Sequence, residues 1–345
     1  MSSSVSHDVS QAHRYPDVVL YHLRFDLKLE NGREYLPAYL GSTFRGIIAA
    51  SFRNLVCLTQ APVCKGCEFL NYCAYPYMFE TLAPVDLPKP LRRRFHQAPR
   101  PYILDLPRVY RGEAMLTLGI TLVGRAIDYL PYLIYVIQQA GQNKGLGKSQ
   151  VPYRLTRVTD YGTQNGNVIF NAERGMLSAD VEPITLSDLH EPSDAGTEEL
   201  SLEFITPLRI KKYGAIQENA RRLNFGVLID LLLRRLQSLS LFHCGHEWAP
   251  NNIPCEVARE VQVSATDLRL QKLQRYSARQ QRKLPLDGLV GTITFRGSIG
   301  QFLPLIKMGS FVHVGAGTAF GLGRYHLKQP SLQQSRDDYG KQIYA

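Results

Sequence analysis

A short pattern that occurs twice in this 345-residue chain constrains the fold more than any other feature. Each copy has an apolar segment ending in glycine, then a Leu-Pro pair, then a glycine-rich loop ending in a basic residue. The copies span residues 120–148 and 293–324. Each predicts a strand, a helix and a loop whose backbone N–H groups can surround a phosphate, with Lys148 or Arg324 adding charge. The duplication therefore predicts two similar modules that handle a polyanion such as nucleic acid.

The size and charge of the chain agree with this prediction. A chain of 345 residues can form two domains of ordinary size. The net charge of +10 and the pI of about 9.3 favour nucleic acid or an anionic membrane as the partner. The longest apolar stretch, residues 130–137, is much shorter than the roughly 20 residues that span a bilayer, and the N-terminus lacks a signal-peptide pattern. We therefore expect no membrane partner.

The spacing of apolar residues predicts an α+β fold. Alternation predicts a strand at 18–30, and helical spacing predicts a helix over 35–56. The predicted elements that follow are a strand at 114–123, a helix at 131–139, a glycine loop at 141–150 and a strand at 153–158. One strand of a complete βαββαβ unit is not located in the proline-rich segment 84–107.

The same order of elements starts again at residue 200. The second set is a strand at 200–210, a helix at 225–241, strands at 261–268 and 289–295, a helix at 302–307, the second glycine loop and a strand at 324–327. Two tandem ferredoxin-like βαββαβ domains are the simplest account. The predicted divisions are a disordered tail at 1–15, an N-terminal domain at 16–169, an acidic linker at 170–199, a C-terminal domain at 200–330 and a tail at 331–345.

Several segments carry a resemblance to a known family. The second loop, residues 313–324 with its four glycines, lies between the last helix and the last strand, and further similar segments are 98–104, 204–211, 275–280 and 285–291. In these segments the chain resembles the CRISPR-associated RAMP superfamily, in particular its precursor-crRNA processing endoribonucleases. The position between the first two glycines, often lysine in that family, is Ala316 here.

The resemblance implies a fold, a substrate and a reaction. It implies two RAMP (RRM-like) domains and a basic cleft that binds CRISPR repeat or precursor crRNA. It also implies cleavage without a metal, in which the ribose 2′-OH attacks the adjacent phosphodiester and leaves a 2′,3′-cyclic phosphate and a 5′-OH. The implied protein partners are other CRISPR effector or adaptation proteins. A non-catalytic RAMP subunit that holds guide RNA in an effector complex is the alternative.

Such cleavage needs a base, an acid and a cation or N–H donors for the phosphate oxygens. Family members commonly use a histidine near the first helix, but no residue between Tyr35 and Cys57 is a histidine. His313 at the start of the second loop, His22 on the polar side of the first strand and Arg45 on the first helix are the catalytic candidates. Each also has an ordinary structural or solvent-exposed interpretation.

The candidate RNA-binding residues combine glycines, cations and a tyrosine, which suits backbone contact and base stacking. They are Gly315, Gly317, Gly321, Gly323, Arg324, Lys211, Lys212, Arg275, Tyr276, Arg279, Arg282, Lys283 and Lys148.

Four of the six cysteines lie close together in sequence, as an insertion at 57–73 in the first domain. They are Cys57, Cys64, Cys67 and Cys73. This clustering argues against a disulfide framework and indicates a reducing cytoplasm. It predicts a structural metal, and the spacing leaves zinc and [4Fe–4S] both open.

Two further hypotheses depend on metals. An iron–sulfur enzyme acting on DNA is a third functional interpretation of the chain. Cys244 and Cys255 could form a second metal site with His243 or His246.

Overall fold

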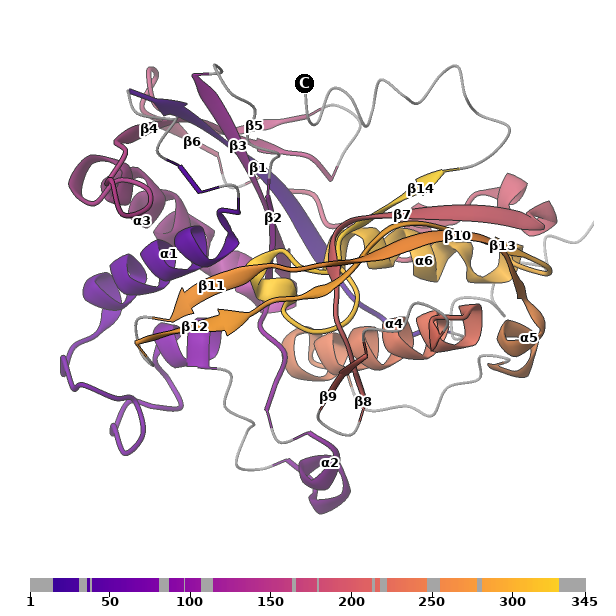
Figure 1. Ribbon diagram of the computed structural model, residues 1–345. Coiled ribbons are helices and arrows are strands. Elements are labelled where there is room, and N and C mark those ends of the chain that lie inside the picture. The colour runs from indigo at the N-terminus through magenta and orange to yellow at the C-terminus, as the bar shows by residue number, and fades with distance from the viewer. Residues whose placement is uncertain are drawn as a thin grey trace, which may run out of the picture. The chain divides into compact units, whose positions relative to one another are not determined.

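The computed structural model describes residues 15–30, 36–37, 39–80, 87–95, 97–106, 114–162, 166–178, 180–212, 215–217, 222–246, 255–277 and 281–328 (Figure 1). The chain divides into two compact units. The N-terminal unit contains residues 20–183 together with 319–321, and the C-terminal unit contains the strand-bearing segments 184–318 and 322–328. The tails predicted at 1–15 and 331–345 lie almost wholly outside the described residues.

The N-terminal unit is built on one antiparallel sheet with strand order β2-β3-β1-β4-β5-β6. Its strands are β1 (Leu20–Leu29), β2 (Tyr102–Asp105), β3 (Met115–Val123), β4 (Tyr153–Asp160), β5 (Val168–Asn171) and β6 (Met176–Leu177), and its helices are α1 (Gly41–Val56), α2 (Lys89–Arg94) and α3 (Leu130–Asn143). Strand β2 is the strand that the sequence did not locate.

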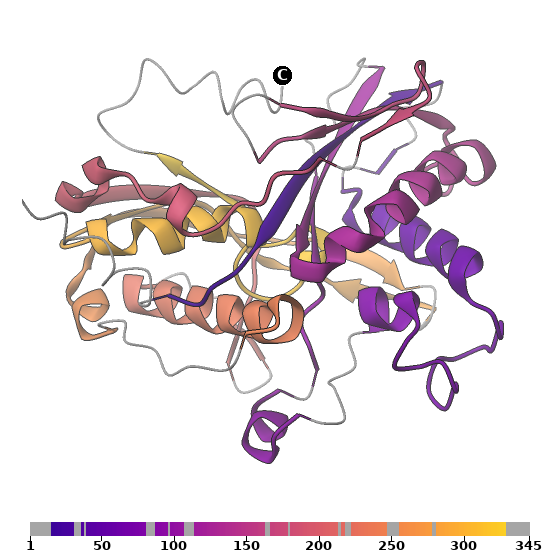
Figure 2. The ribbon, with the colours of Figure 1, turned by 180° about the vertical axis from the view of Figure 1, so that it is seen from behind.

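Alternation and helical spacing account for the core of this unit. Leu23, Phe25 and Leu27 alternate along β1 and are fully buried, while Phe44 and Phe52 lie two turns apart on α1 and face the same core. Helices α1 and α3 lie side by side in both views (Figures 1 and 2).

The C-terminal unit repeats the order strand, helix, strand, strand, helix, strand. Its four-stranded antiparallel sheet has the order β10-β13-β7-β14. The elements are β7 (Glu199–Leu208), α4 (Phe225–Leu239), α5 (Cys255–Glu260), β10 (Gln262–Gln271), β13 (Gly288–Arg296), α6 (Leu303–Val312) and β14 (Tyr325–Lys328). Asn224 caps α4 by accepting a hydrogen bond from the Val227 N–H at 2.9 Å.

Two hairpins are added to this unit. They are β8 (Ile210–Lys212) with β9 (Ala215–Gln217), and β11 (Gln274–Ser277) with β12 (Arg282–Pro285). Figure 1 shows β11–β12 as an extension of the ribbon formed by β10 and β13. The α+β class with antiparallel sheets is therefore confirmed. Along each sheet the four strands of the repeated unit have the same order, β2-β3-β1-β4 in the N-terminal unit and β10-β13-β7-β14 in the C-terminal unit.

The segment 170–199, where the sequence predicts an acidic linker, contains short regular elements. Strands β5 and β6 extend the N-terminal sheet, and a 3-10 turn covers Pro192–Gly196. Asp194 in this turn is 3% exposed, and both of its carboxylate oxygens accept from Lys307 Nζ at 3.0 and 2.9 Å. The acidic composition here partly serves a buried ion pair.

No helix among the described residues is long and apolar enough to cross a membrane.

Candidate functional site

The second glycine loop connects α6 to β14 in a backbone conformation that requires glycine. Gly315, Gly317, Gly321 and Gly323 have φ values of +85°, +90°, +82° and +72°. A Cβ on Gly323 would lie 1.8 Å from the Val314 carbonyl oxygen, and a Cβ on Gly315 would lie 2.7 Å from that of Arg209. A side chain at Gly315 or Gly323 is therefore excluded both by the positive φ and by the close backbone contacts.

Several N–H groups of this loop bond to the protein itself. The Ala316 N–H donates to the Arg209 carbonyl at 2.9 Å, and the Gly323 N–H donates to the Pro207 carbonyl at 3.1 Å. Most of the loop's N–H donors are therefore used within the protein, including those of Val314, Leu322 and Arg324. The Gly315 and Gly317 N–H groups are the loop donors without such a bond among the described residues.

His313 begins this loop, but its side chain is only 1% exposed. The residue has φ +56° and ψ 167° at the end of α6. The preceding carbonyl, that of Val312, accepts from Arg235 Nε at 2.7 Å, and burial lowers the pKa of Arg235 to about 9. In this arrangement the His313 ring lies in the interior and not on a surface that RNA could reach.

Arg324, at the end of the loop, is also interior. Its side chain is 4% exposed and its Nη2 lies 3.0 Å from His326 Nε2. His326 is half-buried on β14, opposite Glu203 of β7. His326 is a polar neighbour of Arg324 that was not among the candidate residues, and its place beside buried Tyr325 in a short alternating strand is the sequence signal for it.

His22 lies in β1 and is 9% exposed. Its Nδ1 lies 2.9 Å from the Thr121 hydroxyl on β3, the residue directly opposite in the strand pairing. Its neighbour Arg24 pairs with Asp26 at 2.7 Å and donates to the Tyr161 hydroxyl at 2.9 Å. The expected exposed polar side of this strand is therefore a set of hydrogen-bonded side chains.

Arg45, on the second turn of α1, is half-buried and does not lie freely in solvent. Its guanidinium carbon lies 4.9 Å from the ring centre of Phe320, a residue of the same unit, and Tyr39 donates a hydrogen bond to the Phe320 carbonyl. Gly41 is needed here because a Cβ would lie 2.0 Å from that carbonyl oxygen.

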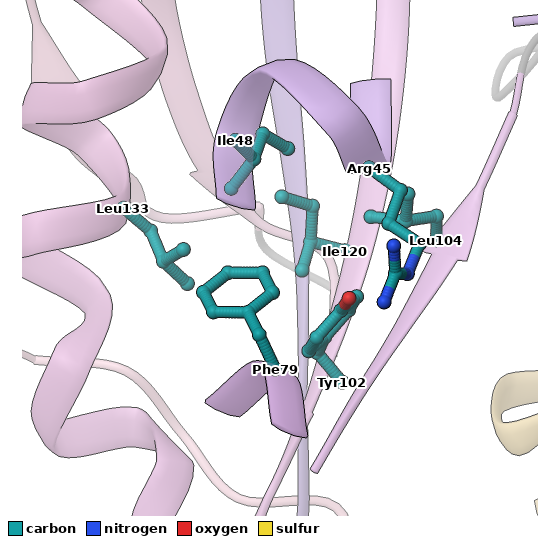
Figure 3. A pocket seen from close by; sticks show the side chains of 7 residues that line it. All are labelled: Arg45, Ile48, Phe79, Tyr102, Leu104, Ile120 and Leu133. Atoms are coloured by element: carbon teal, nitrogen blue, oxygen red, sulfur yellow. The ribbon is translucent and has the colours of Figure 1, made fainter. Parts of the chain in front are cut away.

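Arg45 also lines a small cavity of about 10 Å³ (Figure 3). The lining residues are Arg45, Ile48, Phe79, Tyr102, Leu104, Ile120 and Leu133. Arg45 Nε and the Tyr102 hydroxyl oxygen are both buried. Burial raises the pKa of Tyr102, and the positive charges of Arg45 and Arg100 act in the opposite direction.

The β11–β12 hairpin carries exposed cations and an exposed aromatic ring. Tyr276 is 57% exposed and lies directly opposite Lys283. Arg282 and Lys283 are exposed, and Arg275 is half-buried. Lys211 on β8 is also exposed. Arg279 and the side chain of Lys212 lie outside the described residues.

The hairpin is held at its base by Arg209. This residue follows β7 and donates to the backbone carbonyls of Pro285 and Asp287, each at 3.1 Å. The Arg209 carbonyl accepts from the second glycine loop, so one residue fixes both elements.

The first glycine loop is a tight turn. Leu146 and Val151 exchange two backbone hydrogen bonds of 2.8 and 3.0 Å around it, and Gly145 and Gly147 supply φ values of +63° and +71°. Lys148 lies exposed within the turn. The two loops are therefore alike in sequence and different in construction.

The predicted metal centre is wrong. Among the described residues, which include the whole segment 57–73, no group of three or more His, Cys, Asp or Glu side chains is placed to hold a metal ion. The four cysteines are free thiols, and the Thr59 hydroxyl lies near two of them, 4.0 Å from Cys57 Sγ and 3.7 Å from Cys67 Sγ. Arg53 helps hold the loop by donating to the carbonyls of Ala61 and Pro62.

The same finding removes the second metal hypothesis. Cys244 and Cys255 are free thiols that are not part of a metal-binding group, and His246 Nε2 lies 3.5 Å from an Asp17 carboxylate oxygen. Neither zinc nor an iron–sulfur cluster is supported by the positions of these side chains.

Two segments of the chain match known protein families. Residues 202–325 match the model of the family described as the CRISPR-associated endoribonuclease Cas6, and residues 18–182 match a family described as an N-terminal domain, AF_1859_N. A protein of Archaeoglobus fulgidus described as uncharacterized is 25% identical over 313 residues, which are 88% of this chain and 97% of that protein.

Two groups of solved structures share the fold. A Cas6 product complex has a TM-score of 0.51 at 17% identity, covering 90% of this chain and 99% of that chain. A chain of a partial Cas6-RT-Cas1–Cas2 complex has a TM-score of 0.52 at 15% identity, covering 94% of this chain and 48% of that chain.

The protein has a mixed α+β fold with antiparallel sheets, and this fold is similar to that of solved Cas6 structures. The resemblance found in the second glycine loop is confirmed for this segment: residues 202–325 match the Cas6 endoribonuclease family, and the fold of the chain is similar to that of solved Cas6 structures.

Proposed function

We propose that this protein is an endoribonuclease that binds CRISPR repeat RNA and cleaves precursor crRNA without a catalytic metal. The observation that carries the proposal is the match of residues 202–325 to the Cas6 endoribonuclease family. The strand order β2-β3-β1-β4 in one unit and β10-β13-β7-β14 in the other supports two tandem ferredoxin-like domains of the RRM/RAMP kind. The net charge of +10 suits a polyanionic substrate.

The proposed reaction is an internal transfer at the phosphodiester. The 2′-oxygen attacks the adjacent phosphorus and gives its proton to a base, while the bond from phosphorus to the 5′-oxygen breaks and that oxygen takes up a proton. The products are a 2′,3′-cyclic phosphate and a 5′-OH. Negative charge grows on the non-bridging oxygens, so nearby cations and N–H donors accelerate the step.

Burial favours one of the three catalytic candidates. His22 and His313 are 9% and 1% exposed, whereas Arg45 is half-buried. We therefore assign Arg45 of the N-terminal unit to charge stabilisation at the phosphate. The Gly315 and Gly317 N–H groups are assigned to RNA contact within the C-terminal unit.

RNA binding is assigned to the β11–β12 hairpin and to Lys211 on the β8–β9 hairpin of the same unit. Tyr276 offers a ring for base stacking next to Lys283, and Arg282 and Lys211 offer charge to phosphates. Lys148 in the N-terminal unit and Arg275 in the C-terminal unit are further cations proposed to contact RNA phosphates.

A second candidate function is supported by specific residues. The first helix lacks a histidine, Ala316 stands where the family often has lysine, and both candidate histidines are buried. These features favour a non-catalytic subunit that holds guide RNA beside other CRISPR proteins. A chain of similar fold occurs in a Cas6-RT-Cas1–Cas2 complex, together with other CRISPR proteins.

One experiment separates the two functions. The full-length protein is incubated with end-labelled repeat RNA in EDTA, beside the same RNA carrying a 2′-deoxy residue upstream of the scissile bond. Cleavage of the first RNA alone, with a 2′,3′-cyclic phosphate on the upstream product, supports the endoribonuclease. Tight binding of both RNAs without cleavage supports the guide-holding subunit, and binding of neither contradicts both.

A further inference from the structure

The segment that follows α1 gathers four free thiols that take no part in the proposed reaction. We call residues 57–73 the cysteine loop, which Figures 1 and 2 show extending from the end of α1. Cys57, Cys64, Cys67 and Cys73 are all half-buried, so a small solute can reach their sulfur atoms. The segment between the first and the last of them contains turns and bends and no strand.

Two of these thiols lie beside the same hydroxyl group. The Thr59 hydroxyl oxygen lies 4.0 Å from Cys57 Sγ and 3.7 Å from Cys67 Sγ. A disulfide brings two sulfur atoms to about 2.05 Å. Because turns and bends connect Cys57 to Cys67, this approach displaces the loop and leaves the sheet and α1 in place.

The surroundings of Cys57 favour its thiolate, which is the form that attacks an oxidant. Burial raises the pKa of this thiol, but three other groups act in the opposite direction and together lower it. They are the Gln60 backbone N–H, the Thr59 hydroxyl and the Arg53 guanidinium. These groups also overcome the position of Cys57 at the carboxyl end of α1, where a negative charge is disfavoured.

The groups around Cys57 are held in place by the loop itself. Arg53 lies one turn before Cys57, and its carbonyl accepts from the Cys57 N–H at 2.9 Å. Its guanidinium donates to the carbonyls of Ala61 and Pro62, so the same cation fixes the loop and stabilises the thiolate. Gln60 has φ +50°, which is uncommon for a residue other than glycine. The site is therefore formed before any oxidant arrives.

Cys67 and Cys64 lie at the two ends of a turn but differ in their surroundings. The Cys67 N–H donates to the Cys64 carbonyl at 3.1 Å, and Gly66 between them has φ +84°. Burial and the nearby Glu80 carboxylate raise the pKa of Cys64. Since Cys64 is the less ionised thiol and Cys67 is the one beside Thr59, Cys67 is the second member of the pair.

We propose that Cys57 and Cys67 form a reversible oxidation site for hydroperoxides, in which Cys57 reacts first and Cys67 closes a disulfide with it. The Cys57 sulfur attacks a peroxide oxygen, so that an S–O bond forms, the O–O bond breaks and the departing oxygen leaves as water after taking up a proton. The Cys67 sulfur then attacks the Cys57 sulfur, so that the S–S bond forms, the S–O bond breaks and a second water leaves with the Cys67 thiol proton. The two thiols are oxidised and hydrogen peroxide is reduced to water. A thiol reductant restores both, as is usual for disulfides that sense oxidants in reducing compartments.

The test maps disulfides in the full-length protein by mass spectrometry. The reduced protein is freed of reductant, treated with a small molar excess of hydrogen peroxide, alkylated and digested with trypsin. Because trypsin cleaves after Arg53 and Lys65, a Cys57–Cys67 disulfide joins the peptide 54–65 to the peptide that begins at Gly66. We expect this cross-link in wild type, fragment ions that assign it to these two sulfur atoms, and its loss after dithiothreitol.

Single substitutions test the role of each thiol. Cys57→Ser is expected to abolish the cross-link. Cys67→Ser is expected to leave a sulfenic acid on Cys57 that dimedone traps, because the second thiol is missing. Cys73→Ser is the matched control, since it removes another half-buried thiol of the cysteine loop, and it is expected to retain the cross-link. The fragment ions of wild type identify the pair without any substitution, so the test stands even if a variant fails to fold.

Several outcomes overturn the proposal. They are a wild-type protein whose loop thiols all remain alkylatable after peroxide, a disulfide that joins two chains on a non-reducing gel, and equal loss of the cross-link in Cys73→Ser. A cross-link that survives Cys57→Ser and disappears in Cys64→Ser would belong to Cys64 and Cys67, and it also overturns the assignment. None of these measurements involves RNA, so the proposed ribonuclease activity can fail without affecting them.

Discussion

At the scale of single residues, His313 holds a backbone conformation that is ordinarily reserved for glycine, with φ +56° and ψ 167°. Two substitutions that both delete the ring separate this strain from the loss of packing. We expect His313→Gly to be more stable than His313→Ala by about 1–3 kcal/mol, the usual cost of such a conformation. Urea unfolding of the two variants measures the difference. Ala50→Gly in α1 is the control, because glycine there is expected to lower the unfolding free energy; a more stable alanine at 313 would contradict the assignment.

Gly323 and Gly175 form a second matched pair. Both have positive φ, +72° and +59°, but a Cβ on Gly323 would lie 1.8 Å from the Val314 carbonyl oxygen, whereas a Cβ on Gly175 would meet nothing within 4 Å. We expect Gly175→Ala to cost about 1 kcal/mol from φ alone and Gly323→Ala about 3 kcal/mol or more, because backbone must also move. Chemical denaturation tests this, and equal costs would show that the loop can relax around the added methyl group.

At the scale of elements, the β11–β12 hairpin is expected to be a separable RNA contact. Tyr276→Ala should weaken binding of an uncleavable 2′-deoxy repeat RNA at least about fivefold, the lower end of the cost of losing one stacked base. Tyr276→Phe should retain most of the affinity, because the ring and not the hydroxyl stacks. Fluorescence anisotropy measures both. Tyr135→Ala, which removes a tyrosine of similar exposure from the uncharged surface of α3, should leave the affinity unchanged; an equal loss there would refute a hairpin-specific contact.

Elements with a clear period were predictable from the sequence, and contacts made across the chain were not. Helix α1 was predictable because Phe44, Ile48 and Phe52 repeat every four residues, and β1 because its core residues alternate. Strand β2 was missed because its four residues directly follow Pro101 and are too few to show a period.

The candidate site was less predictable than the fold for the same reason. The glycines of the second loop indicate positive φ, but nothing local shows that the Ala316 and Gly323 N–H groups bond to the backbone around β7. The spacing of Cys57 and Cys67 shows closeness in sequence and not the conformation in which Thr59 lies near both thiols. Burial of His22 and His313 depends on strands and helices distant in sequence.

At the scale of the whole molecule, the +10 charge should make RNA affinity strongly dependent on salt. Each phosphate neutralised on a single strand contributes about −0.7 to the slope of log affinity against log salt, because bound counterions are released. If Arg282 and Lys283 each contact one phosphate, the double substitution Arg282→Ala with Lys283→Ala should make the slope shallower by about 1.4. Tyr276→Ala should lower affinity at every salt concentration with the slope unchanged, because stacking releases no counterions. Titrations of uncleavable repeat RNA from about 0.05 to 0.3 M salt measure these slopes. An unaltered slope in the double variant would show that phosphate contacts lie elsewhere, and a shallower slope in Tyr276→Ala would show that the ring acts by positioning the cations.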